Sequence, residues 1–190
     1  PNVGKSTLMN ALIGEKLSII TPKAQTTRHR ILGILNERDY QIIFSDTPGV
    51  IDPAYRLQEN MMNSGYSSFS DADVLVYMVE VGEKSLKDPK ISERLTKTEI
   101  PLLLLLNKID LAQQEDVAKE INKWSKDFPN AQVLPISALN KFNLDVIKNK
   151  ILELIPISPA YFDKNAITDK SERFFIEEII REKILKHYKK

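Results

Sequence analysis

Pro1-Asn2-Val3-Gly4-Lys5-Ser6-Thr7 opens the sequence, and an apolar-rich run at residues 8–13 follows it and ends at Gly14. A glycine lets the backbone approach a phosphate, a lysine reaches the β- and γ-phosphates, and a hydroxyl binds Mg²⁺. A helix over residues 6–13 adds unpaired N–H groups and a positive dipole end at its start. The stretch therefore predicts the second half of a phosphate-binding loop, and the first glycine of the full pattern falls before Pro1.

The composition indicates a globular protein with no overall attraction for nucleic acid or membrane. The 190 residues are 42% hydrophobic, and 27 basic against 26 acidic residues leave a net charge of +1. Any nucleic-acid binding must therefore come from a local patch. The absence of cysteine excludes disulfides and thiolate metal sites. The longest apolar run, residues 100–106, is far too short to span a bilayer.

Apolar runs and helical patterns alternate along the chain. Strands are expected at residues 31–35, 40–45, 74–81, 102–106 and 133–136, and helices at residues 6–13, 88–98, 117–128 and 144–154. Several of the strands are apolar throughout, as in parallel sheets that are covered on both faces. The alternation predicts the α/β class, with a doubly wound and mostly parallel sheet. In such a sheet Asp46, at the end of a strand, lies beside the phosphate loop.

The C-terminal part of the chain differs in composition from what precedes it. Pro156 and Pro159 end the expected domain 1–157, which lacks its first strand, and residues 158–171 are expected to be a linker. A last helix over residues 172–190 either docks on the preceding domain or opens a second, incomplete one. Its expected apolar side consists of Phe175, Ile176, Ile179, Ile180, Ile184 and Tyr188.

Two loops that follow buried strands have the chemistry to select guanine. In Asn107-Lys108-Ile109-Asp110 the carboxylate of Asp110 can accept two hydrogen bonds from guanine, whereas adenine offers neither. Asn107 can bridge the base and the phosphate loop, and the stem of Lys108 can lie over the purine. In Ser137-Ala138-Leu139 the Ala138 N–H can donate to guanine O6. An ATP-using enzyme is disfavoured by both loops.

These motifs, in this order, resemble the five motifs of translation-factor-class GTPases. Lys23-Ala24-Gln25-Thr26-Thr27-Arg28-His29-Arg30 and Ala166-Ile167-Thr168-Asp169-Lys170-Ser171-Glu172-Arg173-Phe174 more narrowly resemble the Era family of bacterial ribosome-assembly GTPases. The likeness spans nearly the whole chain. It implies a P-loop GTPase domain followed by the start of an α+β KH-type domain, with residues 172–190 as the first helix of that domain.

The resemblance also implies a role for each matching residue. Lys5 would hold the β- and γ-phosphates, and the Gly49 N–H would sense the γ-phosphate. Mg²⁺ would be bound by Ser6, by Thr27 and, through water, by Asp46; Thr26 is the alternative to Thr27. The catalytic set is thus Lys5, Thr27, Asp46 and Gly49. The nucleotide-binding set is Asn2, Val3, Gly4, Lys5, Ser6, Thr7, Asp46, Thr47, Pro48, Gly49, Asn107, Lys108, Asp110, Ser137, Ala138 and Leu139.

Hydrolysis is expected to be slow and to respond to potassium. Val50 follows Gly49, where Ras-like enzymes have a glutamine that orients water. Asn2 matches the asparagine that helps to bind K⁺ in potassium-activated relatives, where the ion replaces an arginine finger. Two alternatives stay open: another potassium-activated factor such as the double-GTPase assembly factor, and a nucleotide-gated binding module with little intrinsic turnover.

The partners implied by the resemblance are GTP, GDP, 16S rRNA and the small ribosomal subunit, whose assembly the protein would serve as a nucleotide switch. It also implies a monomer in the cytoplasm, with peripheral association at the inner membrane face. KH modules clamp RNA with a GXXG loop, and no such sequence follows Phe174 here. RNA binding is therefore expected of a longer protein rather than of these residues alone.

Overall fold

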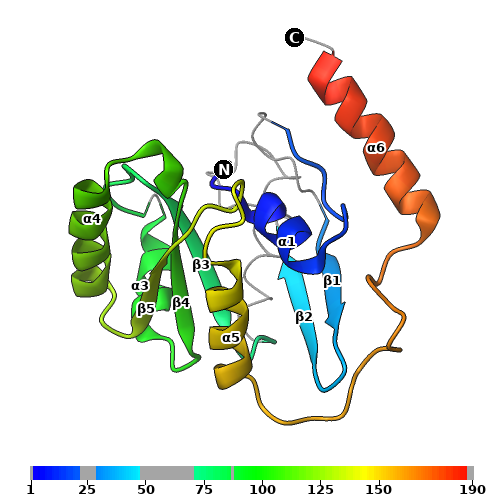
Figure 1. Ribbon diagram of the computed structural model, residues 1–190, viewed down its shortest axis with the longest axis horizontal. Helices are drawn as coiled ribbons and strands as arrows, with labels where there is room; N and C mark the ends of the chain where they lie inside the picture. Colours follow the sequence, from blue (N-terminus) through cyan, green and yellow to red (C-terminus); the bar gives the residue numbers. More distant parts are fainter. Residues whose placement is uncertain (1, 22–28, 48–70, 87, 188–190) are drawn as a thin grey trace. The chain divides into compact units, whose positions relative to one another are not determined.

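The computed structural model describes residues 2–21, 29–47, 71–86 and 88–187. The chain divides into two compact units (Figure 1). The first unit consists of Pro1–Ser68 together with Ser158–Lys190, and the second is Phe69–Ile157. The second unit ends at residue 157, where the sequence places the end of the first domain, and the expected linker and last helix group with the N-terminal residues.

Helix α1 (Lys5–Ile13) of the first unit is bounded by two glycines in the left-handed conformation. Gly4 precedes it with a φ of 104°, and Gly14 ends it with a φ of 85°. Residues with a Cβ rarely adopt such angles, so glycine is required at both ends. The N–H of Gly14 donates to the Asn10 carbonyl at 2.9 Å, which closes the last turn. The predicted C-cap is thereby confirmed, and the helix begins one residue earlier than predicted.

Strands β1 (Ile31–Asn36) and β2 (Gln41–Asp46) form an antiparallel hairpin that packs against α1. Their register places Ile31 opposite Asp46 and Asn36 opposite Gln41. The small core beneath α1 is made of buried Met9, Leu17 and Ile31 and partly buried Ile13, Phe44, Phe174 and Phe175. Both strands lie close to their predicted places: β1 ends one residue later than predicted, and β2 begins and ends one residue later, so that it includes Asp46.

The segment that was predicted to be a linker is hydrogen-bonded along the edge of β1. Thr168 forms a bridge with Gly33, and the Ile34 N–H donates to the Ile167 carbonyl at 2.9 Å. The Leu32 N–H donates to Asp169 Oδ1 at 3.0 Å. Figure 1 shows this segment running beside β1 toward α6. These bonds satisfy edge groups of the hairpin that would otherwise face solvent.

Helix α6 (Glu172–His187) corrects a prediction about which of its sides packs. Its isoleucines are 49–59% exposed, with Ile176 at 59% and Ile180 at 55%, whereas Phe175 of the predicted side packs on the core as expected. The side that faces the rest of the unit instead carries Phe174 and the buried carboxylate of Glu182, which is 2% exposed. The reason is electrostatic, because Glu182 is ion-paired with Lys16 at 2.6 Å. Tyr188 lies outside the described residues.

The second unit contains a parallel sheet of the order β3-β4-β5. Its strands are β3 (Leu75–Glu80), β4 (Leu102–Asn107) and β5 (Ala131–Pro135), at the places that the apolar runs predict. Every residue of β4 is buried, as expected for a central strand that is covered on both faces. The α/β class is therefore confirmed.

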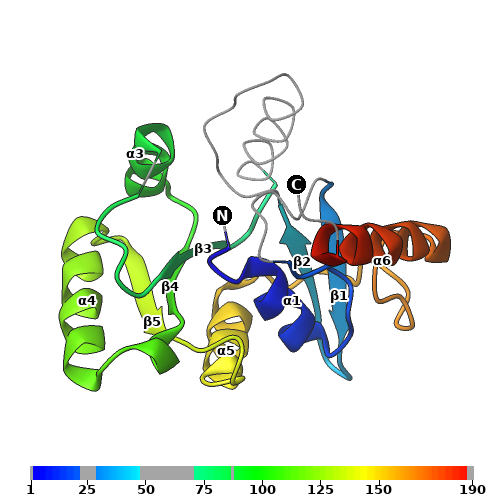
Figure 2. The same cartoon turned by 90° about the horizontal axis from the view of Figure 1, so that it is seen from above.

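Three helices flank this sheet (Figure 2). They are α3 (Pro89–Lys97), α4 (Gln114–Asp127) and α5 (Leu144–Leu154). The α3 helix starts as predicted, because the Asp88 side chain accepts a hydrogen bond from the Lys90 N–H at 2.8 Å and Pro89 occupies the first turn. Buried Trp124 anchors α4, and buried Ile147 and Ile151 anchor α5. None of the described helices is long and apolar enough to cross a membrane.

Candidate nucleotide-binding site

The phosphate part of the candidate site lies at the start of α1 in the first unit. The left-handed Gly4 turns the chain into the helix, so that Lys5 and Ser6 stand at its N-terminus. The first N–H groups of a helix have no partner within it, and they give this end a positive potential. A helix end of this kind is suited to an anion, which is the ligand that the sequence predicts here.

Ser6 and Asp46 meet in the structure although 40 residues separate them. The Ser6 hydroxyl donates to Asp46 Oδ2 at 3.0 Å. Ser6 is part of α1, while Asp46 is the last residue of β2 and is 5% exposed. The packing of α1 on the hairpin therefore places one hydroxyl and one carboxylate side by side. These are two hard oxygen ligands of the kind that Mg²⁺ takes.

The chemistry of this pair fits the magnesium ion that the motifs imply. Mg²⁺ is usually held by one or two protein oxygens, with water and substrate phosphates filling the other positions. Among the described residues no group of three or more His, Cys, Asp or Glu side chains could hold a metal by itself. Ser6 and Asp46 thus have the donor set of a metal site that a nucleotide completes.

Burial changes the acid–base behaviour of Lys5. Removal of its ammonium from water lowers the pKa of Lys5 below the ordinary value of 10.5, while the negative charge of Asp46 acts in the opposite direction. A desolvated ammonium gains more from a new anionic partner than an exposed one does. Lys5 is therefore prepared to bind phosphate oxygens.

Sequence reasoning missed Ser18, which donates from its hydroxyl to the same Asp46 oxygen at 2.8 Å. Ser18 follows Lys16 and Leu17 in the turn after α1 and is 1% exposed. It belongs to no motif. The only signal in the sequence is a polar residue within the apolar stretch of residues 17–20, and such a residue needs a partner when it is buried.

The base part of the candidate site lies in the second unit, where the two guanine-selecting loops are joined by a hydrogen bond. Asn107 Oδ1 accepts from the Ala138 N–H at 2.9 Å, and the two residues are 3% and 2% exposed. The sequence assigns this N–H to guanine O6 instead. In the structure Asn107 thus connects the two loops, and Ala138 already has a hydrogen-bond partner.

Asp110 and Ser137 line a hollow of about 540 Å³ together with Ile109, Asn140, Lys141, Phe142 and Asn143. Asp110 is exposed and belongs to a short 3₁₀ turn, Ile109–Leu111. The second loop closes on itself, since Ser137 and Phe142 form a bridge. Leu139 lies between them and is 76% exposed. The carboxylate that the sequence assigns to the base is thus accessible to a ligand.

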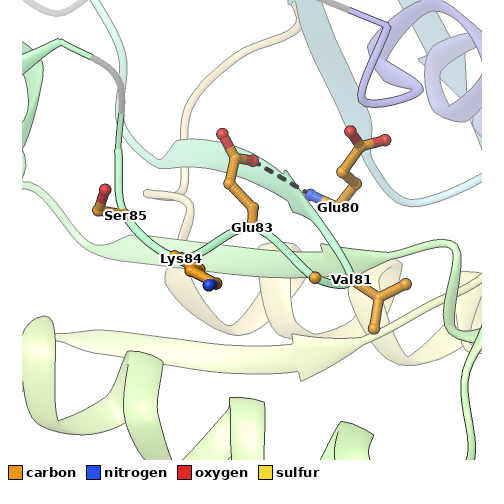
Figure 3. A pocket seen from close by; sticks show the side chains of 6 residues that line it. Glu80, Val81, Glu83, Lys84 and Ser85 are labelled. Atoms are coloured by element: carbon orange, nitrogen blue, oxygen red, sulfur yellow. Dashed lines mark hydrogen bonds between the residues drawn. The ribbon is translucent and has the colours of Figure 1, made fainter.

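Lys108 has a partner of its own. Its backbone is left-handed, with a φ of 66°, and its ammonium is ion-paired with Glu80 at the end of β3. Glu80 also lines a hollow of about 420 Å³ on the loop that follows β3 (Figure 3). There the Glu80 N–H donates to Glu83 Oε2 at 3.5 Å. The residues that line this hollow include none that the sequence assigns to the nucleotide.

Several predicted site residues lie outside the described residues. They are Thr27 with its alternative Thr26, Pro48 and Gly49, and also Val50. Asn2, Val3, Thr7 and Thr47 are described, and they flank the phosphate part of the site along the chain. Asn2 has a left-handed backbone with a φ of 65°.

Comparison with known proteins places these observations in a family. The family model described as 50S ribosome-binding GTPase matches residues 1–108. GTPase Era of Clostridium beijerinckii is 44% identical over 187 residues, which are 98% of this chain and 63% of that protein. GTPase Era of Clostridium perfringens is 43% identical over 188 residues, 98% of this chain and 64% of that protein.

Solved structures give the same result. A crystal structure of an Era variant from Aquifex aeolicus bound to GDP and AlF4⁻ matches with a TM-score of 0.91 at 37% identity, over 100% of this chain and 65% of that chain. Era in complex with MgGDPNP and nucleotides 1506–1542 of 16S ribosomal RNA matches with a TM-score of 0.92 at 37% identity, over the same shares. The chain thus spans somewhat less than two thirds of the length of these relatives.

Proposed function

The chain belongs to the 50S ribosome-binding GTPase family, and from this premise we propose that it binds GTP with Mg²⁺ and hydrolyses it to GDP and phosphate. The observation that carries the proposal is the contact between Ser6 and Asp46 at the N-terminus of α1, with 3.0 Å between hydroxyl and carboxylate oxygen. It supplies the two protein oxygens that a Mg²⁺–nucleotide complex requires.

The phosphate end of the nucleotide is assigned to the first unit. Lys5 neutralises charge on the β- and γ-phosphates, and the N–H groups at the start of α1 bind their oxygens. Mg²⁺ would be held by Ser6 and Thr27 and, through water, by Asp46, and it would supply further positive charge at the transferring phosphoryl group. Gly49 contributes its N–H to the γ-phosphate. The attacking group is water, and hydrolysis releases the segments around Thr27 and Gly49.

The base is assigned to the second unit. The exposed Asp110 carboxylate accepts from the N1–H and 2-amino groups of guanine, so adenine is rejected for lack of both donors. The Ala138 N–H is shared between Asn107 Oδ1, where it now binds at 2.9 Å, and guanine O6. Release of Lys108 from Glu80 allows its stem to cover the purine. Ser137 and Leu139 frame the base from the same loop.

Slow turnover and potassium dependence form a separate part of the proposal. Val50 has no polar atom that could orient water, so the intrinsic rate is low. A K⁺ ion near Asn2 compensates part of the negative charge of the transition state. Phosphate release in KCl and NaCl at matched ionic strength tests this, and equal rates in the two salts would contradict it.

The biological role proposed is that of a nucleotide switch in assembly of the small ribosomal subunit. A similar solved structure is described as Era with MgGDPNP and a fragment of 16S ribosomal RNA. We assign residues 172–190 to the first helix of a KH-type RNA-binding domain, 158–171 to a connecting segment and 1–157 to the GTPase domain. The protein would act as a monomer in the cytoplasm, with peripheral contact to the inner membrane face.

An alternative function is a nucleotide-gated binding module that hardly turns over, favoured by Val50 in place of a water-orienting side chain. A single-turnover measurement of phosphate release, made without any partner, distinguishes the GTPase enzyme from the binding module. Hydrolysis by the chain alone supports the enzyme, whereas stable GTP over the life of the complex supports the module. A further alternative is another potassium-activated ribosome-associated GTPase, such as the double-GTPase assembly factor.

The decisive experiment is calorimetry of GDP and ADP binding in the presence of Mg²⁺. The chain is compared with Asp110→Asn, which keeps the size of the side chain and removes its charge. We expect preference for GDP over ADP by at least about a hundredfold, lost in the variant. Equal binding of the two nucleotides would overturn the guanine assignment, and no binding of either would overturn the nucleotide site altogether.

A further inference from the structure

We propose that Ser18 is a positioning residue of the Mg²⁺ site, because its buried hydroxyl fixes the Asp46 carboxylate that the metal requires. The inference rests on the proposed function and adds a residue that belongs to none of the five motifs. Ser18 touches neither nucleotide nor metal in this role. It acts only through Asp46.

Two hydroxyls converge on one carboxylate oxygen. Ser18 Oγ donates to Asp46 Oδ2 at 2.8 Å, and Ser6 Oγ donates to the same atom at 3.0 Å. Ser18 is 1% exposed and Asp46 is 5% exposed, so water competes little for either group. A buried carboxylate is stable only when such donors satisfy it. Of the two donors, Ser6 is also the predicted metal ligand, whereas Ser18 has no second task.

The backbone of Ser18 is itself held in place by Asn10 of α1. Asn10 Oδ1 accepts from the N–H groups of Leu17 and Ser18, both at 2.9 Å. Its Nδ2 donates to the Ser18 carbonyl at 2.7 Å. Asn10 thus ties the turn after α1 back onto the same helix that carries Ser6. One side chain fixes the distance between the two serines that bind Asp46.

The consequence for the metal follows from preorganisation. A metal site binds tightly when its ligands are already oriented by further hydrogen bonds, and loss of such a bond typically weakens metal binding by about tenfold or more. With Ser18 present, the Asp46 carboxylate cannot rotate freely when the oxygen of Ser6 turns to the metal. Without it, Asp46 Oδ2 loses the shorter of these two hydroxyl hydrogen bonds. Ser18 should therefore affect the Mg²⁺-dependent part of nucleotide binding and leave the Mg²⁺-independent part unchanged.

The test compares Ser18→Ala with the unmodified chain and with Ser45→Ala as a matched control. Ser45 precedes Asp46, is exposed and accepts from Arg30 Nε at 2.8 Å. The Ser45→Ala variant also loses a serine hydroxyl, but the two serine hydrogen bonds to the Asp46 carboxylate stay in place. GDP affinity is measured by calorimetry with Mg²⁺ and with EDTA, and the melting temperature of the nucleotide-free protein confirms folding. We expect Ser18→Ala to lose about tenfold of the Mg²⁺-dependent gain in affinity, with GDP affinity in EDTA unchanged.

Three results would overturn the inference. A full Mg²⁺-dependent gain in Ser18→Ala would show that the hydroxyl does not position the site. Equal loss of affinity with Mg²⁺ and with EDTA would show a general structural role. Failure of the unmodified chain to bind GDP would refute both the proposed function and the inference. The first two results, in contrast, would refute the inference alone, because the unmodified chain still binds GDP. If Ser18→Ala does not fold, Ser18→Cys, which keeps the shape and a weaker donor, is measured in its place and must lose part of the gain.

Discussion

The side chain of Asn107 accepts a hydrogen bond of 2.9 Å from the backbone N–H of Ala138, although Asn107 is the last residue of β4 and Ala138 lies in the loop that follows β5. Both are buried, at 3% and 2% exposure. The contact exists because β4 and β5 are neighbours whose carboxyl ends meet at one edge. It makes the two guanine-selecting loops one structural element.

Asn107→Ala should therefore destabilise the protein as well as weaken nucleotide binding. The substitution leaves the buried Ala138 N–H without its partner, which typically costs about 1–3 kcal/mol. Chemical denaturation of the nucleotide-free protein measures the loss. Asn140→Ala is the control, because Asn140 is exposed in the same loop and uses only its backbone N–H, toward Ser137 Oγ. Equal stability of the two variants would contradict the structural role of Asn107.

The pH dependence of stability should contain a contribution from Glu182. Burial alone would raise the pKa of Glu182, but hydrogen bonds from Lys16, Lys186 and the Ile20 N–H outweigh it and lower the pKa from 4.5 to about 2. A lowered carboxyl pKa stabilises the folded protein above the unfolded value of 4.5, and this stabilisation is lost as the pH falls toward 2. Its size is on the order of 2–3 kcal/mol.

Glu182→Gln tests this contribution. At pH 7 the variant should be less stable by part or all of that amount, and the difference from the unmodified chain should shrink between pH 4.5 and 2. Urea denaturation at several pH values measures both. Glu177→Gln is the control, because Glu177 lies on the same helix in an exposed pair with Arg173. A difference that stays constant with pH would contradict the ion-pair assignment.

Lys5→Met should stabilise the nucleotide-free protein while it abolishes nucleotide binding. The lowered pKa of Lys5 means that its charge is costly in the folded state. Between that pKa and 10.5 the unfolded chain binds more protons, so the stability of the unmodified chain rises with pH in this window. Removal of the charge should raise stability by on the order of 1 kcal/mol. A melting curve in EDTA that shows lower stability for the variant would refute the prediction.

The packing of α6 can be tested by substitutions on its two sides. Ile176→Ser and Ile180→Ser should change the free energy of unfolding by less than about 0.5 kcal/mol each, because both side chains are more than half exposed. Phe174→Ala should cost about 2 kcal/mol or more, because the ring packs on the core of Met9, Leu17 and Ile31. The opposite ranking would mean that the isoleucine side is the one that packs.

Gly33 should tolerate a methyl group and reject a larger side chain. A Cβ at this position lies 3.1 Å from Ile13 Cγ1 and 3.3 Å from Met9 Sδ, which are parts of movable side chains. Gly33→Ala should therefore leave the free energy of unfolding nearly unchanged. The cost of small shifts of the Ile13 and Met9 side chains offsets the gain from a less flexible unfolded chain. Gly33→Val should cost about 1–3 kcal/mol through overpacking against α1. Thermal unfolding of both variants provides the comparison.

The order of the elements and the identity of the motif residues could be predicted from the amino-acid sequence. Strands and helices follow from local periodicity, and the end of α1 and the start of α3 follow from Gly14 and Asp88, because backbone angles and caps are local properties. The positions of Lys5, Ser6, Asp46, Asn107 and Asp110 in their motifs could likewise be predicted without a structure.

Which polar groups pair with one another could be seen only in the folded structure. Nothing local indicates that Ser18 binds Asp46, that Ala138 donates to Asn107, or that α6 packs through Glu182 rather than through its isoleucines. The physical reason is that a buried polar or charged group must find a partner wherever the fold brings one. Such partners lie 28, 31 and 166 residues away along the chain, far beyond the reach of any helical or strand pattern.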